Sequence, residues 1–323
     1  MTDTRKTKRK LSRRAWLTGS AAGVAGLAAG CESFEGFRGL DWTTAASQDA
    51  TPSRTPVIDA HVHLFAADEA RFPYHPNAPY VPESPSPVEP FLEHLAAARI
   101  DGAVLVHPEP YQDDHRYTLH CLAVAGKRLR ATCLFDPNSP ETPEAMMKLC
   151  EQPGFVAMRI HCHREDRLPE FDSGLLREVW HTAAQLGLCL QLHGVPKHLA
   201  RFARLIQDFP RTPVLIDHLG RPGQGTAEEI QGVLRLAGLS NVYMKFSGLA
   251  YASREPYPHA DIKPLLEGIV DLFGPRRMLW GDSYSGKPYG QATHAVDDVL
   301  SFVDAPGRRE IAGGTAARLF GFA

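Results

Sequence analysis

Two histidines at the end of a short apolar run are the first residues in this sequence whose types and spacing suggest chemistry. The run is Val57-Ile58-Asp59-Ala60-His61-Val62-His63, and its length and composition are typical of a buried strand. Alternate residues of a strand point to the same face, so the imidazoles of His61 and His63 can approach one centre. Imidazole nitrogens bind zinc and related metals, which makes the pair a candidate metal site.

Later apolar runs end in comparable polar groups. His193, Asp217-His218 and Asp282 each follow directly on such a run. Imidazoles and a carboxylate together can bind a transition metal, while an ionised carboxylate can take a proton from an attacking water. The recurrence of these groups at strand ends therefore predicts one site that activates water.

Cationic side chains at or just after strand ends can hold the carboxylates of a substrate, because guanidinium and ammonium groups bind such anions. Ion pairing within the fold and plain solvation remain alternatives for each of them. His161-Cys162-His163 repeats the spacing of the first histidine pair and forms a rival metal site, but its strand lacks an equally spaced carboxylate. We expect His161 to line the pocket instead. The expected substrate-binding residues are Arg159, His161, Arg164, Arg221, Lys245 and Tyr284.

The elements that must position these groups alternate along the chain. Short apolar runs are separated by amphipathic stretches such as 175–186 and 262–273, where apolar residues recur at three- and four-residue steps. Eight repeats of this alternation predict an α/β fold, a (β/α)8 TIM barrel whose active site lies at the C-terminal ends of its strands. A doubly wound open sheet is the alternative, although no GxGxxG turn follows the first strand. The expected strands are 57–62, 103–106, 131–135, 155–160, 189–192, 214–216, 242–244 and 278–280.

The N-terminal segment reads as a targeting region. A basic run is followed by Ser12-Arg13-Arg14-Ala15-Trp16-Leu17 and a short, weakly apolar stretch, so that residues 1–31 resemble a twin-arginine export signal. Leu27-Ala28-Ala29-Gly30-Cys31 resembles a lipobox with its leucine one position early. Lipidation of Cys31, cleavage with release, and an uncleaved anchor all stay open. We expect a protein that is periplasmic or membrane-anchored and facing the cell exterior, with a flexible linker over 32–54 and one barrel domain over 55–323.

The composition of the chain limits the classes of molecule that it is expected to bind. Without residues 1–30 the chain would hold 28 basic (35 − 7) and 36 acidic (37 − 1) residues, a net charge of −8, so no general attraction for nucleic acid is expected. The cysteines are scattered without CxxC spacing, which argues against a disulfide framework. A small-molecule substrate is the expected partner, with membrane contact only through an N-terminal lipid anchor, and nothing in the sequence indicates an oligomeric state.

Several segments together resemble the amidohydrolase superfamily, and within it the amidohydrolase-related group that includes lactonases of dicarboxylated pyrones and of sugar or muconic lactones. The resemblance covers about residues 56–322. Where relatives commonly carry Thr-Asp-Trp-Pro, this chain has Gly281-Asp282-Ser283-Tyr284-Ser285, which keeps the aspartate and alters the pocket wall. The supporting segments are the first histidine-containing run, Ile216-Asp217-His218-Leu219-Gly220-Arg221-Pro222, Lys245-Phe246-Ser247-Gly248, Trp280-Gly281-Asp282 and Ile311-Ala312-Gly313-Gly314-Thr315-Ala316-Ala317-Arg318-Leu319-Phe320-Gly321.

The resemblance implies that Asp282 is the general base acting on water and that His61, His63 and His193 bind a divalent metal or polarise the substrate carbonyl. His218 would lie beside them as a ligand or a hydrogen-bond donor. The group contains zinc enzymes and metal-free lactonases, and no lysine ends the fourth strand, so we expect at most one metal, zinc, with metal-independent catalysis still open. The expected catalytic residues are Asp282, His218 and His193, and the expected metal ligands are His61, His63, His193 and Asp282.

The expected activity is hydrolysis of a lactone or related carbonyl compound that is small and carboxylated or sugar-derived. Non-oxidative, metal-dependent decarboxylation of an aromatic or vinylogous acid is an alternative, because related barrels with similar residues catalyse it. A catalytically inactive, exported binding protein is another alternative. The retention of Asp282 together with three strand-end histidines argues against the loss of turnover.

Overall fold

The computed structural model describes residues 54–282, 284 and 286–322. The export signal expected in residues 1–31, including Cys31, and all but Arg54 of the expected linker lie outside the described residues. Among the helices that the structure does describe, none combines the length and the apolar character needed to cross a bilayer.

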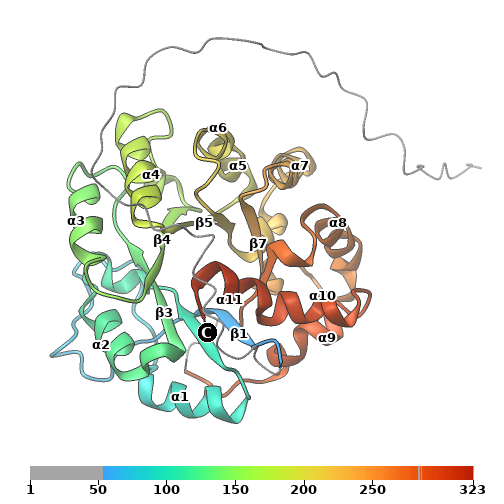
Figure 1. Cartoon of the computed structure of the whole chain (residues 1–323), viewed down its shortest axis with the longest axis horizontal. Helices are drawn as coiled ribbons and strands as arrows, with labels where there is room; N and C mark the ends of the chain where they lie inside the picture. The colour runs from blue at the N-terminus through green and yellow to red at the C-terminus, as the bar shows by residue number, and fades with distance from the viewer. Residues whose placement is uncertain (1–53, 283, 285, 323) are drawn as a thin grey trace, which may run out of the picture. The chain divides into compact units, whose positions relative to one another are not determined.

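In the described part of the chain, eight parallel strands lie side by side in the order of the sequence (Figure 1). The backbone N–H of His63 at the end of the first strand donates to the carbonyl of Tyr284, just after the last strand, at 2.8 Å. This contact brings the two edges together into a nearly closed barrel, consistent with the expected TIM barrel. The sequential strand order lacks the reversal of a doubly wound sheet. The strands are β1 (Ile58–Val62), β2 (Gly102–Leu105), β3 (Leu129–Leu134), β4 (Phe155–Cys162), β5 (Cys189–Gly194), β6 (Val214–Ile216), β7 (Val242–Phe246) and β8 (Met278–Trp280).

Helices surround the strands, and their ends follow from local sequence signals (Figure 1). In α4, the Ser173 side chain accepts a hydrogen bond from the first turn, and the helix ends at Gly187, whose φ is 68°. Val179 and Trp180 of this helix are buried in the main hydrophobic core. The helices are α1 (Val88–Ala97), α2 (Arg116–Ala125), α3 (Thr142–Leu149), α4 (Gly174–Leu186), α5 (Pro196–Leu199), α6 (Ala203–Asp208), α7 (Ala227–Arg235), α8 (Lys263–Phe273), α9 (Ala295–Val299), α10 (Ala305–Arg309) and α11 (Thr315–Phe320).

Polar side chains occupy the inside of the barrel near the C-terminal ends of its strands. They come from β4, β5, the end of β6 and β7, and they bond to one another, so they must point toward the barrel axis. Burial of charged groups is costly unless each finds a partner. At this level of the barrel the interior is therefore polar, whereas a buried apolar cluster that includes Ala157 and Leu215 occupies the same strands two residues earlier. The buried polar residues in this layer are Arg159, Gln191, Asp217 and Lys245.

The end of the chain packs against the start of the barrel. Gly313 lies in a π-helical turn, Glu310–Gly314, that contacts both β1 and β8. A Cβ atom at Gly313 would lie 2.0 Å from the carbonyl oxygen of Pro56 and 2.8 Å from the backbone nitrogen of Ile58. Only glycine allows this approach, which explains the Gly-Gly pair in the closing segment of the sequence.

We predict that Gly313→Ala lowers the free energy of unfolding by about 1–3 kcal/mol or more, because backbone atoms must move to admit the methyl group. Gly268→Ala is the matched control, since Gly268 lies within α8 and a Cβ there meets nothing within 4 Å. Alanine should raise stability at that position by about 0.5–1 kcal/mol. Urea unfolding followed by circular dichroism measures both changes, and similar effects at the two positions would show that the contact with Pro56 imposes no constraint.

Candidate active site

A cavity of about 650 Å³ opens at the C-terminal ends of the strands. Histidines from four strands reach it, together with side chains from the long connection between β1 and α1, such as Tyr80 and Glu83. Enzymes with this fold carry their active sites on this face. The lining histidines are His61, His63, His161, His163, His193 and His218.

His61 and His63 meet as their spacing predicts. Their Nε2 atoms lie 3.1 Å apart, and Nδ1 of His63 lies 2.9 Å from the carbonyl oxygen of Val106. Two ligands of a tetrahedral zinc ion, each at about 2.0–2.1 Å from it, are about 3.3 Å apart. Burial lowers the pKa of His63 to about 4 and, helped by the charge of Lys245, lowers that of His61 well below its usual value. Both rings are therefore neutral at pH 7, as metal ligands must be.

Asp217 lies at the centre of the polar interior, and sequence reasoning did not select it. Its Oδ2 accepts hydrogen bonds from Nε and Nη2 of Arg159, at 3.0 and 2.8 Å, and from Gln191 at 2.9 Å. Nζ of Lys245 lies 2.9 Å from its Oδ1. Burial alone would raise the pKa of Asp217, but Lys245 and Arg159 hold it well below its usual range. The alternation of inward residues at the end of β6, one step before His218, is the signal that could have revealed it.

This network engages two of the expected substrate-binding residues. Arg159 is nearly fully buried against Asp217, and Lys245 is fully buried with its Nζ 3.3 Å from Nδ1 of His61. Arg159 also lines the cavity, whereas Lys245 is not among the described residues that line it. Lys245 is therefore ion-paired inside the barrel, which was the alternative to binding a substrate carboxylate.

His218 lies between the two histidine pairs. Its Nδ1 is 2.9 Å from the Ser247 hydroxyl, and its ring centre is 4.6 Å from that of His61 and 5.4 Å from that of His193. Gly248, with a φ of 59°, makes room for it, because a Cβ atom there would lie 2.7 Å from Nδ1 of His218. The Lys245-Phe246-Ser247-Gly248 segment thus positions an imidazole as well as the buried ammonium.

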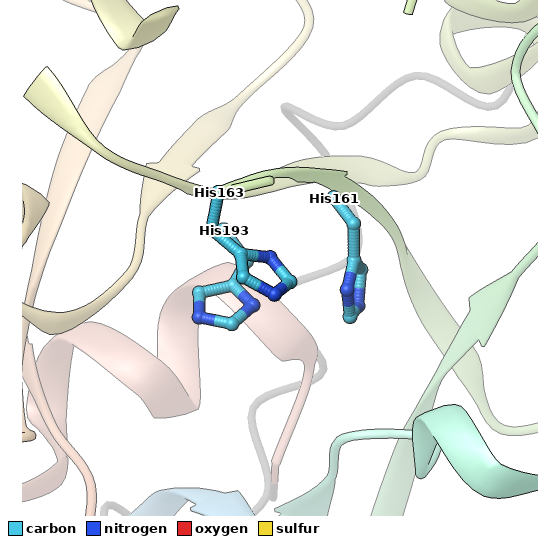
Figure 2. A group of neighbouring side chains, drawn as sticks. All are labelled: His161, His163 and His193. Atoms are coloured by element: carbon cyan, nitrogen blue, oxygen red, sulfur yellow. The ribbon is translucent and has the colours of Figure 1, made fainter. Parts of the chain in front are cut away.

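His193 lies closer to the second HxH pair than to the first. Its ring centre is 4.4 Å from that of His163 and 5.1 Å from that of His161, and one nitrogen from each of the three lies within 4.8 Å of the others. Figure 2 shows the three imidazoles side by side. The parallel register pairs His161 with His193 across β4 and β5, which explains the grouping.

Asp282 follows Gly281, which packs directly against β1. A Cβ atom at Gly281 would lie 2.7 Å from Cβ of His61. Asp282 donates its backbone N–H to the carboxylate of Asp59 at 2.9 Å, and burial raises the pKa of its own carboxyl to about 6. Asp282 lines a separate cavity of about 360 Å³, together with Ser247.

The expected ligand set of His61, His63, His193 and Asp282 stays a prediction. Among the described residues, the groups with metal-ligand spacing join His193 to His161 and His163, or join His61 to Asp217 and His218, and neither includes Asp282.

Asp59 is a second buried carboxyl that sequence reasoning did not select. It accepts hydrogen bonds from the backbone N–H groups of His61 and Asp282 and from the Tyr289 hydroxyl. Burial, and then the charge of Asp282, raise its pKa to about 7. Asp59 therefore fixes the end of β8 against β1. The register of β1 shifts between Asp59 and Val62, so simple alternation from His61 gave no signal for it.

A family model described as amidohydrolase matches residues 58–322, nearly all of the described chain. The chain belongs to the amidohydrolase family. It is 26% identical to the 4-sulfomuconolactone hydrolase of Hydrogenophaga intermedia, over 81% of this chain and 88% of that protein. It is also 26% identical to the L-fucono-1,5-lactonase of Burkholderia ambifaria, over 70% and 79%. The structure of a probable 2-pyrone-4,6-dicarboxylic acid hydrolase from Acinetobacter baumannii aligns with a TM-score of 0.71 at 22% identity, covering 82% and 99%.

The remaining expected substrate-binding residues of this amidohydrolase lie in different surroundings. Arg221 lines the cavity with its guanidinium 4.2 Å above the centre of the Tyr251 ring. Arg164 also lines the cavity but is half exposed and paired with Asp166 at 2.6 Å. Tyr284 is buried against α1, with its hydroxyl 2.7 Å from Nδ1 of His94. Arg221 is therefore the cavity cation best placed to meet an anionic substrate.

Amidohydrolase superfamily members usually bind a divalent metal, and the described residues hold a histidine-rich candidate site for one. The six lining imidazoles form an arc from His63 through His61, His218 and His193 to the second HxH pair. Neutral imidazoles can bind a metal or donate a hydrogen bond to an oxyanion. The arrangement can therefore polarise a carbonyl group in the cavity.

We predict that Asp217→Asn lowers the free energy of unfolding of this amidohydrolase by about 3–5 kcal/mol, because Lys245 and Arg159 would keep buried charges without a counter-ion. Asp166→Asn is the matched control, since its pair with Arg164 is exposed to solvent and should contribute little to stability. Chemical unfolding at pH 7 compares the two variants. A loss at Asp217 no larger than that at Asp166 would contradict the assigned role.

Proposed function

We propose that this amidohydrolase hydrolyses a lactone, a cyclic C–O ester bond, in a small substrate that is carboxylated or sugar-derived. The position of Asp282, next to the Gly281 that contacts His61, is the observation that carries the proposal. Two relatives named as lactone-hydrolysing enzymes match over 70–81% of the chain and support it. The cavity also presents Arg221, whose charge suits a carboxylated substrate.

In the proposed reaction, Asp282 takes a proton from water while the water oxygen attacks the lactone carbonyl carbon. The carbonyl oxygen becomes an oxyanion, which His218 stabilises by donating from Nε2 while the Ser247 hydroxyl donates to Nδ1. The ring C–O bond then breaks, and the leaving oxygen takes the proton from Asp282. The products are a carboxylic acid, which releases its proton to the solvent and becomes a carboxylate, and a hydroxyl or keto group, with no other reactant consumed.

The cofactor expected from the sequence is one divalent metal, zinc, with metal-independent hydrolysis as the alternative. Bound zinc would supply Lewis-acid polarisation of the carbonyl group. His61 and His63 have the spacing of two of its ligands, whereas His193 groups with His161 and His163, and Asp282 is in neither group of described residues with metal-ligand spacing. Each step proposed above is therefore carried by the chain's own residues.

We further propose that residues 1–31 direct export by a twin-arginine-type route, which would place the enzyme in the periplasm or on a membrane facing the cell exterior. The ordered succession of basic, weakly apolar and small residues supports this. Mass spectrometry of the mature N-terminus distinguishes a lipidated Cys31 from cleavage with release and from an uncleaved anchor.

We predict that Asp282→Asn lowers kcat for lactone hydrolysis by about 10²–10⁴-fold, the usual contribution of a general base. The base must be deprotonated, so a pKa of about 6 makes wild-type kcat/KM fall as the pH drops below about 6, rather than near the ordinary aspartate value. A panel of carboxylated and sugar lactones, followed by acid release across pH 4–9, measures both effects.

Asp172→Asn is the control for that substitution, because Asp172 is an exposed aspartate outside the cavity. It should leave both kcat and the pH profile unchanged. Undiminished turnover by Asp282→Asn would rule out Asp282 as the base. Carbon dioxide release would instead support decarboxylation, and inactivity of the wild type on the whole panel would support a binding protein.

We predict that Arg221→Gln lowers kcat/KM for carboxylated lactones by about 10- to 100-fold, mainly through KM, because it removes a charged hydrogen-bond donor. Uncharged sugar lactones should be affected far less. Arg164→Gln provides the comparison, since Arg164 lines the same cavity but is already paired with Asp166. Steady-state kinetics with charged and uncharged lactones tests this, and an equal loss for both would contradict carboxylate binding by Arg221.

A further inference from the structure

Three histidines on β4 and β5 form a compact group on one wall of the cavity. His161 is in β4, His163 follows that strand by one residue, and His193 is the register partner of His161 on β5. One ring nitrogen from each lies within 4.8 Å of the other two, and Figure 2 shows the rings gathered beneath the two strands. The elements that position them are strands of the barrel, which hold ligands more accurately than loops do.

Most ring nitrogens of this group lack a hydrogen-bond partner in the described part of the chain. In the described part of the chain, both ring nitrogens of His161 and the Nδ1 atoms of His163 and His193 are buried without a hydrogen bond. His161 itself is only 6% exposed. A buried polar group without a partner destabilises the fold. Such a cluster of unpaired nitrogens is unfavourable unless a ligand binds them.

The backbone around the group is closely packed. A Cβ atom at Gly194, next to His193, would lie 2.3 Å from Sγ of Cys162, which stands between the two histidines of β4. Glycine therefore lets β5 lie against the side chains of β4 at this level. The close packing holds the three imidazoles near one another.

A carboxylate lies behind His161. Oε2 of Glu109 is 3.5 Å from Nδ1 of His161, and Glu109 also lies 4.0 Å from Nε of Arg167. Its Oε1 has no hydrogen-bond partner among the described residues. Metal-binding histidines usually have a carboxylate or a carbonyl group at their second nitrogen, which fixes the ring and raises its basicity. With Glu109 at Nδ1, Nε2 of His161 is the nitrogen left for a metal.

The competing group of His61, Asp217 and His218 is less suited to a cation. Its carboxylate is already bound by Arg159 and Lys245, and the Lys245 ammonium lies 3.3 Å from His61. A dication placed there would meet this ammonium at short range with little negative charge left to offset it.

We propose that His161, His163 and His193 bind one transition-metal ion, such as Zn²⁺ or Co²⁺, with Glu109 as the outer carboxylate. Three protein ligands leave a coordination position open toward the cavity, where a water or a substrate oxygen can bind. This metal site goes beyond the proposed lactone hydrolysis, because metal binding can be measured with no substrate present. It also differs from the ligand set expected from the sequence by replacing the β1 pair with the β4 pair.

The test uses the full chain, freed of metal with a chelator and titrated with Co²⁺. The expected result for the wild type is one bound Co²⁺ with the visible absorption bands of a low-coordinate imidazole site. Glu109→Gln removes an outer partner and should weaken Co²⁺ binding by about 10- to 100-fold. His163→Gln and His161→Gln each remove a direct ligand and should weaken Co²⁺ binding by more than that. The double variant His61→Gln/His63→Gln should bind Co²⁺ as the wild type does.

His181→Gln is the matched control, since His181 is an exposed histidine of α4 that does not line the cavity. It should leave the titration unchanged. Near-ultraviolet circular dichroism checks that each variant folds. Anomalous scattering from Co²⁺-soaked wild-type crystals locates the ion without any substitution.

The proposal is wrong if the wild type binds no Co²⁺, or if the anomalous peak lies at His61 and His63. Binding that survives His163→Gln and His161→Gln but is lost in the β1 double variant would overturn it equally. None of these results depends on turnover. Undiminished turnover by Asp282→Asn would therefore leave the metal assignment intact. Absence of Co²⁺ binding would likewise leave the assignment of Asp282 as the base intact.

Discussion

Asp217 balances two buried cations inside the barrel, and the site is arranged around that interaction. Its carboxylate bonds to Arg159 of β4, Gln191 of β5 and Lys245 of β7, so one side chain links four neighbouring strands. Two cations against one carboxylate leave the interior with a net positive charge. Burial lowers the pKa of the histidines above this network, and the charges of Lys245 and Arg159 lower it further. The network therefore keeps these imidazoles neutral, the form that binds metals or shares hydrogen bonds.

Glycines at three strand ends allow the imidazoles to approach one another. Gly194 after His193, Gly248 beside His218 and Gly281 beside His61 would each place a Cβ atom within 2.3–2.7 Å of a neighbouring atom. Side chains at these positions would separate the strands at the level of the site. The same closeness explains why the six histidines form a continuous arc.

Much of the fold follows from the sequence, because apolar runs and capping residues act locally. Five strand ends were predicted to within one residue from where apolar runs stop, whereas β4, β5 and β7 run two residues further, and α4 begins and ends at Ser173 and Gly187 as local rules expect. The meeting of His61 and His63 was predictable as well, since two residues of one strand need only its alternation. The predicted export signal and linker lie almost entirely outside the described residues and stay predictions.

The grouping of residues from different strands was harder to predict. His193 lies with His161 and His163 because of the register between β4 and β5, which the composition of neither strand specifies. Lys245 points into the barrel, where it forms an ion pair with Asp217. The sequence around Asp217 and His218 gives no sign of this pairing. Which side chains meet across strands depends on distances around the barrel. The residue types at the strand ends do not determine those distances.

The cavity thus has two chemically different walls. On the side of β1 and β8, His61 and His63 lie above the buried ammonium of Lys245, next to the strand end that carries Asp282. On the side of β4 and β5, the second HxH pair and His193 lie near Glu109, away from that ammonium. A positive interior repels a metal from the first wall and attracts an anionic substrate, whereas the carboxylate of Glu109 makes the second wall more favourable for a cation. Electrostatics therefore favours a cation at the β4 and β5 wall over the β1 wall.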